Sequence, residues 1–483
     1  MMAKHKLRVA YVGLSLPAYF AERLDYRKRS IDGLQKLAEA WDFVFVPVET
    51  IVASEADALQ VANWLKDQHI DFLLIQNTSI SIGDQLLPLV DVAPRIGLWS
   101  LPDPSLEGEV QLHSLVALNE HASILKRYLR HRDIPFKWFY DHADSEMFMR
   151  RFSITVRALT AVKNMENARV GWIGGVSPGF HNMLVDPRRL NERLGLRVGE
   201  HEMAELVRRA EAQQPAAVAA IAKAMRSAAV SVTVSSDVAF ERVTRVYLAL
   251  KEMTEEHGYD ALAVQCWSKI QELYRIVPCM AYSWLGSEDG IAVSCEGDLQ
   301  GAISMYLLNV LNGSSQSSTL LDMAALDPRT RSMMMFHCGV TPRHFANDDG
   351  IKWVDHVMLG RHSGDAPYGV AGDLIFAPQE DTTITYLGDD GSSVLVLRAS
   401  IIEHELKGFD GTRGWFDRFE LNKAVIEPWD LINTLTVRGH EHHFAVGIGD
   451  ITDELMEFAA WKKLRLVERV PYADYLQLDG VNV

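Results

Sequence analysis

Hydrophobic and polar positions alternate along the first third of the chain in a strand-then-helix pattern. Stretches with helical periodicity separate short apolar runs, which lie at residues 7–12, 43–46, 72–75 and 96–99. Strands that alternate with amphipathic helices are typical of a parallel sheet with crossover helices. We therefore predict an N-terminal α/β domain of Rossmann-like, doubly wound type over residues 1–165.

The same pattern starts again after a polar boundary at residues 163–168. Residues 169–173 form an apolar run that ends in Gly174 and Gly175, and helical periodicity returns over 203–225 and 240–257. This pattern predicts a second Rossmann-like domain over residues 166–330.

From about Met333 onward, turn residues multiply and alternation with a period of two replaces helical periodicity. Residues 382–387 and 393–397, joined by Gly388-Asp389-Asp390-Gly391, predict a β-hairpin, because Asp-Gly favours a tight turn. A helix at 453–463 and a strand at 464–467 close the chain. The fold class is thus α/β, with two Rossmann-like domains followed by a β-rich C-terminal domain over 331–483.

Composition narrows the classes of function. The chain of 483 residues carries 64 acidic and 48 basic residues, a net charge of −16, which disfavours nucleic acid and anionic membranes as partners. No stretch is long and apolar enough for a membrane span, and the N-terminus lacks the features of a secretory signal. The four cysteines form no CxxC pair, which favours reduced thiols in the cytoplasm.

Several common catalytic signatures are missing. The glycines after residue 171 lack GxGxxG spacing and no Walker lysine follows them, which argues against nucleotide binding and against a nicotinamide-dependent oxidoreductase. HExxH does not occur, so a zinc peptidase is not indicated.

Three carboxylates lie among apolar neighbours in the second domain. Glu272 falls in a segment rich in large apolar side chains, while Glu296 and Asp298 end an apolar strand before the helix at 301–311. Asp298 could simply cap that helix, and Glu272 could be an exposed helical residue. Together, the three suit a divalent cation such as Mn²⁺ or Mg²⁺, which takes oxygen ligands and an occasional imidazole.

Two segments could supply the imidazole. One holds His337, and the other is the run His440-Glu441-His442-His443 before an apolar strand. On a strand, His440 and His442 share one face while His443 lies on the other, so at most two of these three can meet one site.

These motifs, in this order and spacing, resemble the L-fucose isomerase and L-arabinose isomerase superfamily. The resemblance covers roughly residues 260–465 and rests on four segments: 266–272, 294–302, 336–339 and 442–450. It implies a Mn²⁺-dependent aldose-ketose isomerase with this domain architecture that acts on a small sugar. It also implies a homo-oligomer, often a trimer or hexamer.

Residue roles follow from the resemblance. Glu272 corresponds to an acidic ligand that also serves as acid and base, either Glu296 or Asp298 to the second acidic ligand, and His443 to the histidine ligand. The resemblance places four further side chains near the substrate: His337, Arg343, His344 and His442.

The expected reaction moves a proton between C2 and C1 through a cis-enediolate that the metal stabilises. It predicts that Glu272→Gln loses turnover while it still binds substrate. Three alternatives stay open: a non-catalytic sugar-binding protein, an α/β oxidoreductase or lyase acting on a polyol or sugar acid, and an isomerase for an anionic, sulfonated or carboxylated sugar. The anionic substrate would need basic groups, for which the third domain offers Arg343, His344, Arg361 and His362.

Overall fold

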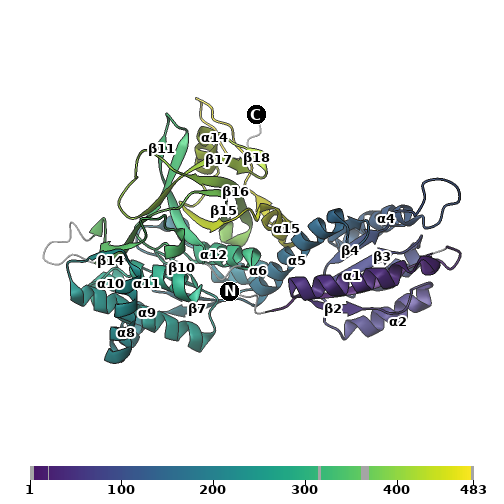
Figure 1. Cartoon of the computed structure of the whole chain (residues 1–483), viewed down its shortest axis with the longest axis horizontal. Helices are drawn as coiled ribbons and strands as arrows, with labels where there is room; N and C mark the ends of the chain where they lie inside the picture. The colour runs from purple at the N-terminus through teal and green to yellow at the C-terminus, as the bar shows by residue number, and fades with distance from the viewer. Residues whose placement is uncertain (1–4, 20, 314–316, 360–368, 480–483) are drawn as a thin grey trace. The chain divides into compact units, whose positions relative to one another are not determined.

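The computed structural model describes residues 5–19, 21–313, 317–359 and 369–479. The chain divides into two compact units, one within residues 4–163 and the other within residues 164–483 (Figure 1).

The N-terminal unit is built on a parallel five-stranded sheet of order β2-β1-β3-β4-β5. Its strands are β1 (Arg8–Leu14), β2 (Val44–Pro47), β3 (Phe72–Asn77), β4 (Ile96–Ser100) and β5 (Phe136–Tyr140). The main helices are α1 (Tyr26–Trp41), α2 (Glu55–Lys66), α4 (Ser114–Ser123) and α5 (Glu146–Asn167). Strands β3 and β4 are buried along their whole length, as expected where helices cover both faces of a parallel sheet.

The second unit opens with another parallel sheet, of order β10-β9-β6-β7. Its strands are β6 (Arg169–Ile173), β7 (Arg197–His201), β9 (Ala261–Val264) and β10 (Ala292–Ser294). Its helices are α6 (Pro187–Leu194), α7 (Met203–Glu211), α8 (Pro215–Ala228), α9 (Asp237–His257), α10 (Lys269–Tyr274), α11 (Cys279–Trp284) and α12 (Leu299–Asn312).

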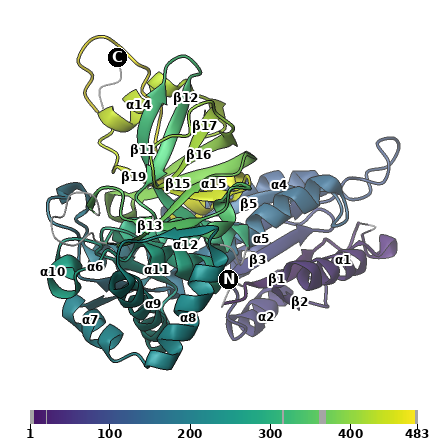
Figure 2. The ribbon, with the colours of Figure 1, turned by 60° about the vertical axis from the view of Figure 1, so that its left-hand side comes forward.

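An antiparallel barrel follows in the chain. Strand β16 pairs with both β15 and β17, so the order β16-β15-β19-β11-β12-β17 closes on itself. Closure leaves these strands without an unpaired edge. The members are β11 (Thr319–Asp327), β12 (Ser332–His337), β15 (Gln379–Gly388), β16 (Ser393–Ile402), β17 (Thr412–Leu421) and β19 (His443–Ile448), the green to yellow strands of Figure 2.

Short strands extend this sheet beyond the barrel. Two helices lie between its later strands in the sequence. The extension runs from β17 to β14 (Gly369–Ile375), β13 (Lys352–Asp355) and β8 (Ser231–Thr233), with β18 (Ala424–Val425) and β20 (Arg465–Leu466) at other edges. The helices are α14 (Pro428–Val437) and α15 (Thr452–Lys462). Because β8 comes from the α/β part of the chain, the parallel and antiparallel layers are joined by strand pairing as well as by packing.

The sequence prediction of the fold class is confirmed: parallel α/β sheets precede a strand-rich C-terminal region. The hairpin predicted around Gly388 is present as β15 and β16, and the last helix lies within a residue of its predicted limits. The barrel begins earlier than residue 331, because β11 starts at Thr319. Within the described residues, no helix is long and apolar enough to cross a membrane.

Candidate metal centre

Four side chains from distant parts of the chain converge where the barrel meets the end of β10. Glu296 lies on the turn between β10 and α12, Asp322 on β11, His337 at the end of β12 and His443 at the start of β19. Donor atoms of Glu296, His337 and His443 lie within 4.8 Å of one another, and those of Asp322, His442 and His443 form a second such group. His443 belongs to both groups, and we call Glu296, Asp322, His337 and His443 the cluster.

Strand register brings two of these side chains together. Asp322 on β11 lies directly opposite His443 on β19. Residues opposite each other in an antiparallel pair have side chains on the same face, with Cβ atoms about 5 Å apart. The distance between Nε2 of His443 and Oδ1 of Asp322 is accordingly 3.6 Å.

The converging atoms are buried and lack hydrogen-bond partners. They are Glu296 Oε2, Asp322 Oδ1, His337 Nε2 and His443 Nε2. Burying a polar atom without a hydrogen-bond partner costs free energy, so four such atoms in one place indicate that they bind a further group. Nε2 of His443 lies 3.6 Å from Oε2 of Glu296, a separation that one ion about 2.1 Å from each donor can bridge. Two carboxylate oxygens and two imidazole nitrogens therefore suit a divalent cation.

The structure separates the two neighbouring acids that the sequence left undecided. Asp298 caps α12, since its Oδ1 accepts from Gly301 N at 2.9 Å, and the same oxygen accepts from Tyr386 Oη at 2.9 Å. Its Oδ2 accepts from Nδ1 of His443 at 2.9 Å. The carboxylate is thus committed to protein donors, while Glu296 keeps a buried oxygen without a partner.

The hydrogen bond between Asp298 and His443 orients the imidazole so that it can bind a metal ion. A proton on Nδ1 leaves Nε2 as the atom with a free lone pair, directed at Glu296 and Asp322. Burial by itself lowers the pKa of His443, but the hydrogen bond to Asp298 and the charge of Asp322 outweigh it and raise that pKa. The pocket therefore favours positive charge.

A tight turn holds Glu296 in place. Its φ of 62° lies in the left-handed region, which is uncommon for a residue with a side chain. Ser177 N donates to the Glu296 carbonyl at 2.8 Å, and Trp172 Nε1 donates to the Gly297 carbonyl at 2.8 Å. These bonds fix the turn against β6 and the loop that follows it.

His442 lies beside the cluster and is partly exposed. Its Nε2 is 3.6 Å from Oε2 of Glu296, and its Nδ1 is 3.0 Å from Nδ2 of Asn182. The ring of Phe180 lies between two aromatic neighbours, 5.2 Å from His442 and 5.8 Å from Trp267 between ring centroids. Aromatic and amide groups therefore lie beside His442, and such groups suit the apolar face and the hydroxyls of a sugar.

The remaining sequence-predicted residues lie elsewhere. Glu272 is exposed on α10, the position expected of a surface helical residue, and is outside the cluster. Arg343 pairs with Glu288 at 2.7 Å. His344 lines a small cavity beside Ser318 and Ile448, near the end of β19 opposite to His443. Burial lowers the pKa of His344 to about 4, so the ring is neutral. Arg361 and His362 lie outside the described residues.

Sequence reasoning missed Asp322. The signal that selected Glu272, an acid among apolar neighbours, is also present in Leu320-Leu321-Asp322-Met323. What the sequence could not provide is the pairing of β11 with β19, because the two strands are more than a hundred residues apart.

Curated proteins similar to this chain share one name. Sulfoquinovose isomerase of Priestia megaterium is 24% identical over 456 residues, which cover 93% of this chain and 96% of that protein. Sulfoquinovose isomerase of Alkalicoccus urumqiensis is 23% identical and covers 82% of this chain and 86% of its own length. That of a Clostridium species is 23% identical, with 76% and 79% covered.

No family model matches the chain. A solute-binding protein of an ABC transporter from Burkholderia multivorans is 12% identical, covers 65% of this chain and 95% of its own, and has a TM-score of 0.16. A score this low carries no argument about fold or function.

Proposed function

We propose that this chain is a divalent-metal-dependent aldose-ketose isomerase that acts on a sulfonated sugar. The observation that carries the proposal is the set of four buried, unpartnered donor atoms on Glu296, Asp322, His337 and His443. The names of the relatives confirm the predicted class of enzyme, an isomerase, and support an anionic sulfo-sugar as substrate. The motifs support membership of the L-fucose isomerase-like superfamily and Mn²⁺ as the ion.

The cluster offers the groups that an isomerisation needs. A divalent ion held by the four side chains would stabilise the negative charge of a cis-enediolate. Glu296 and Asp322 are the carboxylates of the cluster, so we assign to them the proton that moves between C2 and C1. This assignment replaces Glu272 by Asp322. Asp298 keeps His443 oriented, and His442 with Asn182 contacts the substrate.

Two of the basic residues expected to bind an anionic substrate are not free to bind the sulfonate. Arg343 is paired with Glu288, and His344 is neutral in the interior, so neither is a free cation beside the cluster. We assign a substrate contact to His442, a basic side chain that lies beside Glu296 and is partly exposed.

The experiment is a substrate panel followed by NMR. The purified chain, stripped of metal and then supplied with Mn²⁺, is incubated with sulfoquinovose, glucose, L-fucose and L-arabinose, and ketose signals are recorded. We expect a ketose from the sulfonated sugar, with activity lost in EDTA and restored by Mn²⁺. Binding of sugar with no ketose under any condition would favour the sugar-binding alternative. Activity that persists without metal would contradict the proposed centre.

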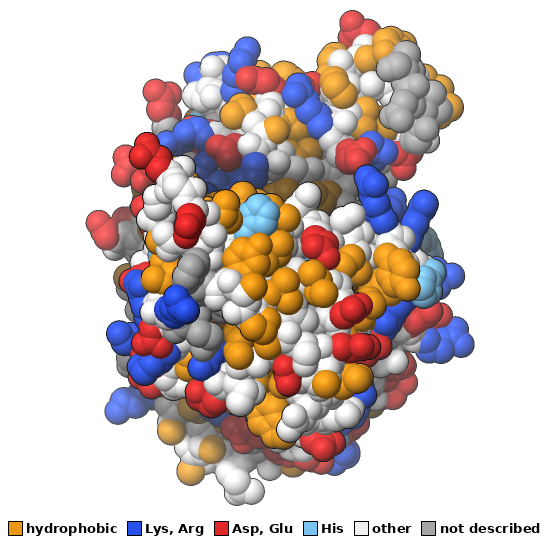
Figure 3. All heavy atoms as spheres, turned by 90° about the vertical axis from the view of Figure 1, so that its right-hand side faces the viewer, with side chains coloured by type: hydrophobic (Ala, Val, Ile, Leu, Met, Phe, Trp, Pro, Cys, Tyr) orange, Lys and Arg blue, Asp and Glu red, His pale blue; other side chains and the backbone are white. Residues whose placement is uncertain are grey.

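We further propose that the enzyme is a cytoplasmic homo-oligomer. The N-terminal unit exposes large hydrophobic side chains, among them Leu106 at 97% and Trp64 at 47% exposure, and Figure 3 shows hydrophobic groups gathered between acidic ones on one face of the molecule. All four cysteines are free, as in a reducing compartment. Light scattering during gel filtration tests the assembly. We expect a trimer or hexamer, and a monomer at micromolar concentration would contradict it.

A further inference from the structure

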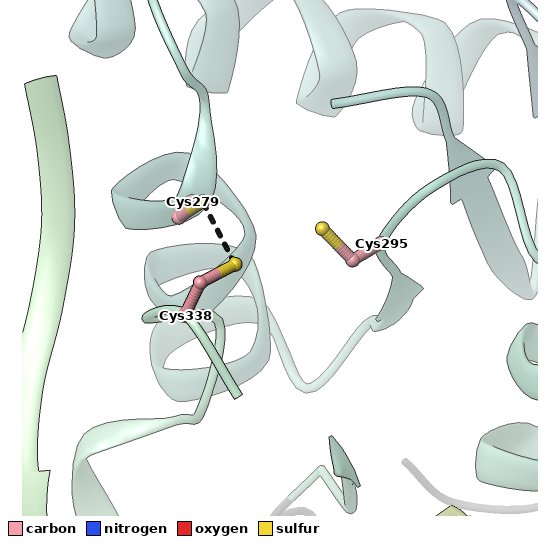
Figure 4. Close-up of side chains that lie close together, drawn as sticks. All are labelled: Cys279, Cys295 and Cys338. Carbon is pink, nitrogen blue, oxygen red and sulfur yellow. Dashed lines mark hydrogen bonds between the residues drawn. The ribbon is translucent and has the colours of Figure 1, made fainter. Parts of the chain in front are cut away.

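The cysteines of the chain gather at one place in its core. Cys279 begins α11, Cys295 follows β10 and Cys338 follows β12, and all three are buried. Their sulfur atoms lie within 4.8 Å of one another. Figure 4 shows the sulfur of Cys295 directed toward those of Cys279 and Cys338. The fourth cysteine, Cys266, is close enough to Cys295 to interact with it but lies outside this set.

The spacing of the sulfur atoms suits a metal ion. Sγ of Cys279 and Sγ of Cys338 are 4.0 Å apart, about twice the length of a disulfide bond, and both cysteines are free. Zinc binds thiolates at about 2.3 Å, so two sulfurs on one ion lie roughly 3.8–4.0 Å apart in tetrahedral or trigonal geometry. Bridging this pair by an ion requires almost no movement.

We propose that Cys279, Cys295 and Cys338 form a thiolate site for a soft metal ion, of the class of zinc, cadmium or copper(I), distinct from the carboxylate-imidazole centre. Soft thiolate ligands select such ions, whereas oxygen ligands select Mn²⁺ or Mg²⁺, so the two sites differ in preference. On binding, each thiol forms a sulfur-metal bond and releases its proton to solvent.

Two cysteines of the thiolate site adjoin ligands of the carboxylate-imidazole centre in the sequence. Cys295 immediately precedes Glu296, and Cys338 immediately follows His337. An ion held by the three sulfurs would link the turn after β10, the end of β12 and the start of α11. It would thereby restrain the backbone next to Glu296 and His337, two ligands of the carboxylate-imidazole centre. It would also stabilise the folded state by mass action.

The test uses Cd²⁺ as the probe. It is added to the reduced full-length chain after the carboxylate-imidazole centre has been saturated with Mn²⁺. Thiolate-to-cadmium charge transfer gives an ultraviolet band that Cd²⁺ on oxygen and nitrogen ligands does not produce. We expect this band to saturate at about one Cd²⁺ per chain. Cys279→Ser should abolish it, because Cys279 supplies a ligand yet has no proposed metal ligand beside it in sequence.

Two control variants separate the sites. Cys266→Ser should keep the band, because its sulfur is outside the set, and Glu296→Gln should keep it while Mn²⁺ binding is lost. A band that survives in Cys279→Ser, or one that disappears in Glu296→Gln, would overturn the proposal. If Cys279→Ser does not fold, the ¹¹³Cd NMR shift of the unaltered protein reports the ligands directly. A shift typical of oxygen and nitrogen ligands would equally overturn it.

Discussion

At the scale of single residues, the unpartnered oxygens of Glu296 and Asp322 distinguish them from the other acids that the sequence singled out. Glu272 is exposed to solvent, and the carboxylate of Asp298 accepts three hydrogen bonds from the protein. The comparison of Asp322 with Glu272 is therefore the sharpest test of the proposed centre.

We predict that Asp322→Asn lowers kcat by roughly 10²- to 10⁴-fold, the usual contribution of a general acid or base. Glu272→Gln should leave kcat within about twofold, because its side chain lies in solvent on α10. Both variants are compared by NMR detection of the ketose at saturating Mn²⁺. The opposite ranking would return the proton transfer to Glu272.

Asp298 should act through His443 and not on the substrate. Asp298→Asn keeps an oxygen that can cap α12 but removes the charge that fixes Nδ1-H of His443, so we predict Mn²⁺ affinity about 10- to 100-fold weaker. Tyr386→Phe removes another hydrogen bond to the same carboxylate without touching His443 and serves as the matched control. Calorimetric titration with Mn²⁺ measures both. Equal losses in the two variants would argue against an orienting role for Asp298.

The raised pKa of His443 predicts how metal binding depends on pH. A proton and a metal ion compete for the same imidazole nitrogen, and the carboxylates around it favour the proton up to a pH above the ordinary value of 6.5. Mn²⁺ affinity should therefore rise with pH through the neutral range, at least up to the raised pKa of His443. Below that point, each proton displaced costs about tenfold in affinity per pH unit. Affinity that is flat between pH 6 and 8 would contradict this competition.

At the scale of elements, the turn that carries Glu296 depends on Gly297. Its φ is 71°, and a Cβ atom there would lie 1.9 Å from the carbonyl oxygen of Gly175, which belongs to the loop after β6. Because that neighbour is backbone, the turn itself must shift to accept a side chain. The shift would carry the Glu296 carboxylate away from the cluster.

We predict that Gly297→Ala weakens Mn²⁺ binding at least tenfold and also lowers Tm. Gly258→Ala is the control, since Gly258 has a φ of 65° at the end of α9 but has nothing within 4 Å of the added Cβ. It should cost only about 1 kcal/mol of conformational strain and leave Mn²⁺ affinity unchanged. Similar Mn²⁺ affinity in both variants would show that the turn tolerates displacement.

Elements with local signals could be predicted, whereas contacts between distant strands could not. The strands of the N-terminal sheet and the hairpin at Gly388 follow from periodicity and turn residues, which act over a few positions. The pairing of Asp322 with His443 depends on barrel register and leaves no local trace. The N-cap of α12 by Asp298 was recognisable from sequence, but its bond to His443 was not.

At the scale of the whole molecule, each of the two units is stabilised by a hydrophobic core of its own. The second unit has a continuous core that runs from Ile173 in the parallel sheet to Val446 in the barrel, so its layers are expected to unfold together. The N-terminal unit has its own core around β1, β3 and β4. Metal binding can stabilise only the second unit directly, since every residue of the cluster belongs to it.

The N-terminal unit should instead carry its own sensitivity to acid, through His121 of α4. This side chain is fully buried, and burial lowers its pKa to about 4. In the unfolded chain the same imidazole has the ordinary pKa of 6.5 and takes up a proton as the pH falls through that value. Its contribution to stability is therefore fully kept above that pH and is lost as the pH falls toward 4, with a total on the order of 3 kcal/mol.

We predict that acid unfolding begins in the N-terminal unit. Hydrogen exchange followed by mass spectrometry should show peptides of β3 and β4 losing protection between pH 6.5 and 4.5, at Mn²⁺ concentrations and pH values where barrel peptides such as β15 stay protected. The variant His121→Gln, which cannot titrate, should flatten this pH dependence even if its stability at pH 7 is lower. Because the prediction concerns the slope and not the absolute stability, a destabilised variant still tests it. Equal slopes in the two proteins would assign the acid sensitivity to other groups.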